Sequence, residues 1–274
     1  MQLSKLIENI KSIKIQGATQ IAIEALKFLK TQPYSKWGSI QRKLEKIRPT
    51  GVVLHNALEL AKKERDVNKI INKLRTARKK LAEKGSKLIR NNYKIMTKCH
   101  SSDVTAVLKH AKRQGKNIIV YALETEPKHQ GILTAKELSK HGIKTVVIED
   151  PACGFFMPKM DIVMVGADSI RMNKSKNDIL IINKIGTYVL ALVSKKHKKP
   201  FYVIGTSFKL DKRKNIEIEE RPAEEVYAGL KETKYLKVRN PAFDITPGKE
   251  LVTRVVTEKG IMTIGNILKL LKEK

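Results

Sequence analysis

A cysteine and an aspartate stand where two short apolar strands are expected to end, and together they could perform acid–base chemistry. Cys99 follows the run 94–97, and Asp168 follows the run 162–165 after two small residues. Runs of this kind are typical of buried parallel strands. Because open α/β sheets bind ligands at the carboxyl edge of their strands, we expect both side chains at one pocket.

The residues around Cys99 favour ionisation of its thiol. Ser101 and Ser102 are both good N-caps for a following helix, and Lys98 and His100 flank the cysteine. A helix N-terminus and nearby cations lower a thiol pKa, so we expect more thiolate than usual at Cys99. The alternative is a small buried cysteine without chemistry.

Asp168 is expected to act as the acid. Desolvation at the end of an apolar strand would raise the pKa of its carboxyl group and keep the proton available for donation. A base and an acid shifted toward neutrality from both sides are typical of proton-transfer isomerisation. The alternative is a structural aspartate at a strand end.

Two stretches are suited to a phosphate group. Asn183, Lys184 and Gly186 precede a helix expected over 187–197, and a helix start with a cation nearby binds anions. Lys209 would add a second point charge. Each residue alone is as easily a solvated surface group.

The N-terminal part offers a second set of anion contacts. Gly17, Ala18 and Thr19 would let the backbone approach an anion, and Arg48 could grip a phosphate with two hydrogen bonds. The hydroxyls and amides at the helix start after Cys99 extend this set.

The pattern of apolar residues divides the chain into a helical part, 1–90, and a part that mixes strands with helices, 91–274. Helical spacing runs through 18–30, 39–47, 52–65 and 67–89. Strands are expected at 94–97, 118–123, 145–148, 162–165 and 201–204, mostly separated by helices. This alternation predicts an α/β protein, with an N-terminal helical domain followed by a Rossmann-like parallel-sheet domain. No G-x-G-x-x-G follows a strand, so a dinucleotide cofactor is not indicated.

Charge is the unusual feature of the composition. The 274 residues carry a net charge of +29, which raises a nucleic-acid partner as a possibility, but aromatic residues make up only 5%. Stacking of bases requires more aromatic side chains, so a lysine-rich surface is the preferred interpretation. Two cysteines, no signal-peptide pattern and no apolar run of membrane length predict a cytoplasmic protein without a membrane contact. The histidines show no metal-ligand spacing.

Seven motifs carry a resemblance to a known family. They are I-Q-G-A-T (15–19), R-P-T (48–50), M-T-K-C-H-S-S (96–102), E-T-E-P-K-H-Q-G (124–131), G-A-D-S-I (166–170), N-K-I-G-T-Y (183–188) and N-P-A-F-D-I-T-P (240–247). In this order they resemble the family of ribose-1,5-bisphosphate isomerases, methylthioribose-1-phosphate isomerases and the α, β and δ regulatory subunits of translation initiation factor 2B.

The resemblance implies roles for individual residues. Cys99 would be the base that takes the substrate proton, and Asp168 the proton donor. Substrate contacts are implied at Gln16, Gly17, Ala18, Thr19, Arg48, Ser101, Ser102, Asp103, Asn183, Lys184 and Lys209. The implied reaction, ribose 1,5-bisphosphate to ribulose 1,5-bisphosphate, needs neither metal nor another cofactor.

Three departures from the family pattern bear on the substrate. Glu126 stands where the isomerases usually have arginine, Gln16 replaces a frequent arginine, and the segment 172–178 is longer than the usual short turn. Both replacements remove positive charge from the expected phosphate region. The rival interpretation is therefore a non-catalytic, initiation-factor-2B-like subunit that binds a nucleotide or sugar phosphate. The resemblance also implies a homo-oligomer, a dimer or hexamer, and AMP as a candidate activator.

Overall fold

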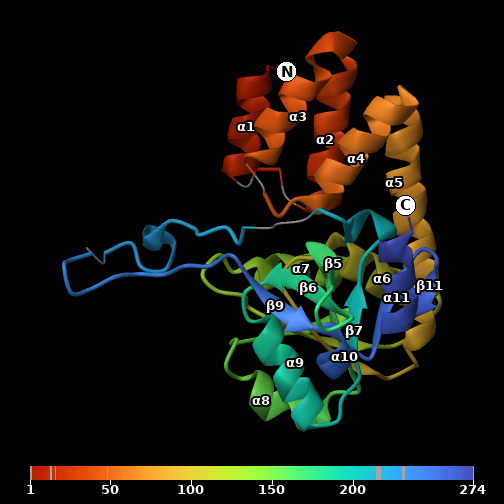
Figure 1. The fold of residues 1–274 in the computed structure, drawn as a ribbon. Coiled ribbons are helices and arrows are strands. Elements are labelled where there is room, and N and C mark those ends of the chain that lie inside the picture. The colour runs from red at the N-terminus through yellow and green to blue at the C-terminus, as the bar shows by residue number, and fades with distance from the viewer. Residues whose placement is uncertain are drawn as a thin grey trace.

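The computed structural model describes residues 2–12, 14–15, 17–47, 49–213, 217–229 and 232–273. Helices form the N-terminal part, and they are α1 (Leu3–Lys11), α2 (Ala18–Lys30), α3 (Trp37–Glu45), α4 (Val52–Glu64) and α5 (Val67–Gly85). α1 to α4 stand together above the sheet, and α5 runs from this group down along it (Figure 1). The helix predicted over 18–30 is found as α2.

One long helix contributes to two apolar cores. Ile70 and Leu74 of α5 pack among the helices of the N-terminal part. Leu81 of the same helix packs instead in a core against one face of the parallel sheet. Apolar residues of α5 recur at helical spacing, so one face of the helix serves both cores. The boundary predicted near residue 90 stays a prediction, because α5 joins the two parts physically.

A seven-stranded sheet forms the centre of the C-terminal part. Its order is β11-β10-β7-β4-β1-β2-β3, and within it only β10 and β11 pair antiparallel. The strands are β1 (Lys94–Lys98), β2 (Ile119–Leu123), β3 (Lys144–Ile148), β4 (Ile162–Val165), β7 (Phe201–Ile204), β10 (Arg254–Thr257) and β11 (Gly260–Met262). The five strands predicted from apolar runs are all present, with ends within one residue of the prediction.

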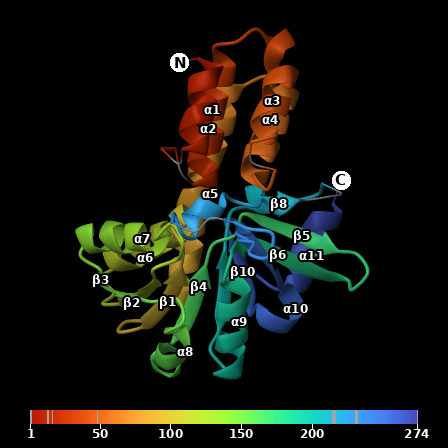
Figure 2. The ribbon, with the colours of Figure 1, turned by 90° about the vertical axis from the view of Figure 1, so that its left-hand side faces the viewer.

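Both faces of this sheet are covered, which explains why its strands read as continuous apolar runs. One face packs against α5, α6 (Ser102–Arg113) and α7 (Gln130–Lys140). The other packs against α8 (Cys153–Phe156), α9 (Thr187–Lys196), α10 (Gly248–Leu251) and α11 (Ile264–Lys272). Figure 2 shows the sheet and its helices beneath α1 to α4.

A second sheet, which the sequence analysis did not predict, lies beside the first. Its order is β8-β5-β6-β9, and its strands are β5 (Ser169–Asn173), β6 (Asp178–Lys184), β8 (Leu210–Asp211) and β9 (Phe243–Pro247). The segment 172–178, expected as an insertion, contains the turn of the β5–β6 hairpin. The hairpin brings Asn183 and Lys184 to the end of β6, close to the strand ends of the larger sheet.

The chain between β8 and β9 leaves the body of the protein. Beyond Arg213, its described residues, 217–229 and 232–242, extend sideways beneath the helical part (Figure 1). The base of this segment is held by backbone hydrogen bonds from Arg221 to Asn240 and from Ala242 to Glu219. We call it the arm. Within the described residues, no helix combines the length and apolar character needed to cross a membrane.

Two glycines of the N-terminal helices, Gly85 and Gly38, should respond in opposite ways to substitution by alanine. A Cβ at Gly85 would lie 2.6 Å from Val107 of α6, whereas a Cβ at Gly38 in α3 meets only the end of a flexible arginine at 3.7 Å. We expect Gly85→Ala to destabilise the fold by about 1–3 kcal/mol through overpacking. Gly38→Ala should stabilise it by about 0.4–1 kcal/mol.

Denaturant unfolding of the two variants, followed by circular dichroism, measures both effects. Equal stabilities would show that α6 yields to the added methyl group, and that the α5–α6 contact is loosely packed.

Candidate functional site

One cavity of about 450 Å³ opens at the carboxyl ends of the parallel strands, below the N-terminal helices. Its wall includes most of the residues predicted for the site: Gly17, Ala18, Thr19, Cys99, Ser101, Ser102, Asp168, Asn183, Lys184 and Lys209. Gln16 and Arg48 lie outside the described residues. The fold therefore brings together side chains from chain segments more than 150 residues apart.

Cys99 is held in a sharp turn directly after β1. Its φ is +65°, and its backbone amide donates to Thr125 Oγ1 at 2.8 Å. The thiol lies 3.7 Å from Gln130 Oε1 at the start of α7. This turn directs the sulfur into the cavity, and Ser101 then caps α6 by accepting a bond from the amide of Val104.

The expected ionisation of Cys99 is wrong in direction. Burial and the negative charge of Asp168 raise the pKa of the Cys99 thiol to about 11, and they outweigh the opposing effect of Lys184 and Lys98. Local sequence showed the cations and the helix start, but not the carboxylate that the fold places beside the sulfur. The resting site therefore holds a protonated thiol.

Asp168 reaches the same cavity from the neighbouring strand β4. Its amide donates to Ile182 O at 2.8 Å, which fixes the turn after the strand against β6. Gly166 makes this turn possible, because a Cβ there would lie 2.5 Å from the hydroxyl oxygen of Ser101. The absent side chain thus lets the two strand ends approach each other closely.

Three buried lysines line the same cavity, and one of them, Lys98, was expected as a cation beside Cys99 but not as a substrate contact. Lys98 Nζ lies 2.9 Å from Asp150 Oδ1, and the lysine is only 3% exposed. Its side chain crosses close to Gly186, where a Cβ would be 2.7 Å from its Cε. The ion pair makes burial of the charge tolerable and sets a cation beneath the helix start of α9.

Lys184 and Lys209 were both predicted, but their surroundings differ. Burial lowers the pKa of Lys184, whose charge in turn acts on the Cys99 thiol. Lys209 Nζ forms an ion pair of 2.9 Å with Asp103, which also pairs with Arg78. Asp103, expected as a substrate contact, is instead a buried partner of these cations and does not line the cavity.

The N-terminal part closes the cavity from above. Gly17 adopts a φ of +79° as the N-cap of α2, so the amides of Ala18 and Thr19 begin that helix at the cavity wall. Thr50 Oγ1 donates to Glu219 Oε1 of the arm at 2.7 Å. The helical part, the sheet and the arm therefore all contribute to the wall of this cavity.

Several cavity residues were missed by the sequence analysis. They are Lys98 at the end of β1, Lys128 after β2, Gln130 at the start of α7, and Glu219, Arg221 and Glu225 of the arm. The strand-end residues could have been found from their position next to Cys99 and before α7. The arm residues carry no such signal, because their segment has only the short 3-10 helix Ala223–Glu225 and reaches the cavity only through the fold.

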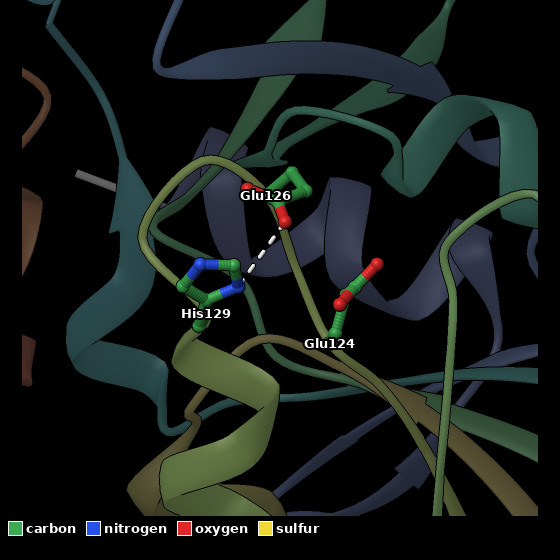
Figure 3. A group of neighbouring side chains, drawn as sticks. All are labelled: Glu124, Glu126 and His129. Carbon is green, nitrogen blue, oxygen red and sulfur yellow. Dashed lines mark ion pairs between the residues drawn. The ribbon is translucent and has the colours of Figure 1, made fainter. Parts of the chain in front are cut away.

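A group with possible metal ligands lies on the loop that follows β2. The ligand atoms of Glu124, Glu126 and His129 lie within 4.8 Å of one another, and Glu126 and His129 form an ion pair of 3.1 Å (Figure 3). The side chains of this pair are about half exposed, and none of the three residues lines the cavity. Glu126 therefore lies outside the wall that would contact a substrate.

Comparison with known proteins identifies relatives along nearly the whole chain. Residues 14–264 match the model of the initiation factor 2 subunit family. A ribose 1,5-bisphosphate isomerase from Archaeoglobus fulgidus is 35% identical over 92% of this chain and 87% of that protein. A methylthioribose-1-phosphate isomerase from Thermoanaerobacter sp. X514 is 34% identical over 95% of this chain and 88% of that protein.

A solved structure shares the architecture. The translation initiation factor 2B protein of Pyrococcus horikoshii OT3 superimposes with a TM-score of 0.82 at 26% identity. The match covers 97% of this chain and 98% of that one. The helical part and the parallel sheet are thus a known combination.

Removal of the Asp168 charge should lower the pKa of the Cys99 thiol. The carboxylate raises this pKa, whereas Lys184 lowers it, so Asp168→Asn and Lys184→Met should shift it in opposite directions. The rate of alkylation by iodoacetamide against pH, measured by mass spectrometry in a Cys153→Ala background, reports the pKa of Cys99. An unchanged value in Asp168→Asn would contradict the proximity of the two groups.

Proposed function

The chain belongs to the initiation factor 2 subunit family, and on this premise we propose that it is a sugar-phosphate isomerase that converts ribose 1,5-bisphosphate to ribulose 1,5-bisphosphate. A single observation carries the proposal: one cavity contains a thiol, a carboxylate and three buried lysines. The isomerase relatives, at 34–35% identity, support the reaction class.

The two reacting groups have the types that this isomerisation requires. A 1-phosphate locks the sugar ring, so the ring oxygen must accept a proton as the ring opens. Asp168 would donate that proton, and Cys99 would remove the proton from C2. Both groups lie at adjacent strand ends, β4 and β1, which pair directly in the sheet.

The high thiol pKa is compatible with this scheme because the two groups are coupled. Transfer of one proton from Cys99 to Asp168 would create the base and the acid together, and it would remove the negative charge that raises the thiol pKa. No proton has to leave the site. The protonated thiol of Cys99 is then one proton transfer away from the active form.

Phosphate binding is assigned to the cations and helix starts of the cavity wall. Lys184 lies near the thiol and would hold the 1-phosphate next to the reacting carbon. The amides at Ala18 and Thr19 and the start of α6 at Ser102 offer hydrogen bonds to the anion. Their roles rest on position in the cavity and on the type of group.

A second function is a binding protein that senses a nucleotide or sugar phosphate. The observation that favours it is the protonated thiol, which is a poor base. Such a protein would use the same cavity without turnover. AMP, as activator or as sensed ligand, belongs to the tests of both functions.

Catalysis by the pair predicts steep losses from single substitutions. We expect the wild-type protein to form ribulose 1,5-bisphosphate from ribose 1,5-bisphosphate in a coupled assay. Cys99→Ser and Asp168→Asn should each lower kcat by roughly 10²–10⁴-fold, because an alcohol is a weak base at neutral pH and an amide cannot donate an acidic proton. The double variant should lose less than the product of both losses.

The control for this experiment is Cys153→Ala, since Cys153 begins α8, packs in the core and lies outside the cavity wall. It should retain kcat. Absence of turnover on every pentose 1-phosphate, together with calorimetric binding of AMP or a sugar phosphate, would contradict the enzyme and support the sensing protein.

An exposed apolar patch predicts self-association. Five large side chains of α8, α9 and β9 are between 38% and 71% exposed, and they are Phe155, Tyr188, Val189, Leu192 and Ile245. These elements contact one another along one side of the molecule (Figure 1). Such a patch is typical of an interface, and burying it would offset the repulsion between protomers of charge +29.

We expect a dimer or larger assembly in light scattering at about 0.15 M salt, where charge repulsion is largely screened. The paired substitution Val189→Glu with Leu192→Glu should yield the monomer. Tyr235→Glu is the matched control, because Tyr235 is 90% exposed on the arm, away from the patch. A monomeric wild-type protein at micromolar concentration would exclude the interface.

A further inference from the structure

Two cations at the cavity wall are not used by the chemistry described above. Lys128 comes from the loop between β2 and α7, and Arg221 comes from the base of the arm. Their side chains are 38% and 28% exposed, so both are open to solvent and to the cavity. They are distant in sequence, and the fold alone brings them together.

A single carboxylate occupies the space between these cations. Glu225 accepts a bond from Arg221 Nε at 3.0 Å, and a second from Arg221 Nη2, and its Oε1 lies 3.1 Å from Lys128 Nζ. Its side chain is only 11% exposed. Burial acts to raise the pKa of Glu225, but the hydrogen bonds from both cations lower it further than burial raises it, so the group is ionised at neutral pH.

This arrangement has the geometry of an anion site that is already filled. A guanidinium that donates two parallel bonds, with an ammonium on one of the same oxygens, is a common way in which proteins bind phosphate. Glu225 presents two oxygens to these donors, as a phosphate group would.

The other cation pairs of the cavity are of a different kind. Lys98 with Asp150 and Lys209 with Asp103 are ion pairs whose lysines are 3% and 5% exposed. Separation of either pair would leave a charge buried without a partner, which is strongly unfavourable. The pairs of Glu225 lie at the rim of the cavity, where the cations are 38% and 28% exposed, so their separation leaves no buried cation without a partner.

Resting on the function proposed above, we propose that Arg221 and Lys128 bind the second phosphate of a sugar bisphosphate and that Glu225 is the internal competitor which this phosphate displaces. A singly phosphorylated sugar lacks the group that can replace Glu225. The competition therefore selects a bisphosphate over a monophosphate. Lys128 and Arg221 supply positive charge at the cavity wall, whereas Glu126 lies outside that wall.

Direct binding tests the assignment without interference from turnover. The Cys99→Ser protein is titrated calorimetrically with ribose 1,5-bisphosphate and, separately, with ribose 1-phosphate. In that background, Arg221→Met and Lys128→Met should each weaken bisphosphate binding roughly 10- to 100-fold, the range for a hydrogen bond to a charged group. Ribose 1-phosphate binding should change less than about threefold, since on this assignment the 1-phosphate lies at Lys184, on which Arg221 acts only through its charge.

Glu225→Gln is the decisive variant, because a neutral amide competes less well for the two cations. It should tighten bisphosphate binding about tenfold or more and leave ribose 1-phosphate binding nearly unchanged. Arg239→Met is the matched control. Arg239 lies on the same arm in an ion pair with Glu220, but its side chain is 80% exposed and does not line the cavity. This control should bind both sugars as the parent does.

Three results would overturn the assignment. They are equal losses for both sugars in Arg221→Met and Lys128→Met, unchanged bisphosphate binding in these variants, and weaker binding of both sugars in Glu225→Gln. Lys128→Met alters only a side chain of a loop, so it still tests the assignment if Arg221→Met fails to fold.

The failure of the proposed function is recognised separately. If the parent Cys99→Ser protein binds neither sugar phosphate and the wild type turns over neither, the isomerase proposal fails, and the bisphosphate assignment with it. If the wild type isomerises a sugar 1-phosphate while Arg221→Met affects both sugars equally, only the bisphosphate assignment fails.

Discussion

The carboxylate of Asp150 connects the ends of three adjacent parallel strands, and the site depends on this connection. Asp150 follows β3, and its carboxylate accepts a hydrogen bond from Lys98 Nζ at the end of β1. It also accepts hydrogen bonds from the backbone amides of Thr125 and Glu126 after β2. The hydroxyl oxygen of Thr125 in turn accepts a hydrogen bond from the backbone amide of Cys99. The ion pair between buried Lys98 and half-buried Asp150 therefore helps to hold the loop that carries the thiol, and loss of the carboxylate would leave an unpaired buried charge among the strand ends.

Electrostatics around the thiol follow from this arrangement. Lys98 is neutralised by Asp150, so its charge acts on Cys99 only weakly beside burial and the charge of Asp168. The site is consequently not a simple thiolate site with a cation next to it. Its protonation state belongs to the cysteine and the aspartate as a pair, and a change at one alters the other.

Closure of the cavity depends on contacts between distant parts of the chain. Thr50 of the helical part binds Glu219, and Asn56 of α4 donates to the carbonyls of Phe208 and Leu210. These bonds link the N-terminal helices to the segment after β7 and to the arm. The arm also carries Arg221 and Glu225, which line the cavity. A shift of the helical part would therefore change the charge at the rim of the cavity through the contact between Thr50 and Glu219.

The sequence by itself determined the strands of the central sheet, because strands buried on both faces leave apolar runs that no exposed segment shows. It also determined that Cys99 and Asp168 meet, since both follow adjacent parallel strands whose carboxyl ends share one edge. The second sheet was missed because the turn of its hairpin is polar, so the segment 172–178 was interpreted as an insertion rather than as the connection between two strands.

Only the tertiary structure decided the charges of the site. The pKa of Cys99 depends on a carboxylate 69 residues away in the chain, and the partner of Asp103 is Lys209 rather than a ligand. The arm carries no regular pattern, yet Arg221 and Glu225 complete the cavity wall. Electrostatic energies depend on distance and burial, and neither quantity is encoded in the spacing of residues along the chain.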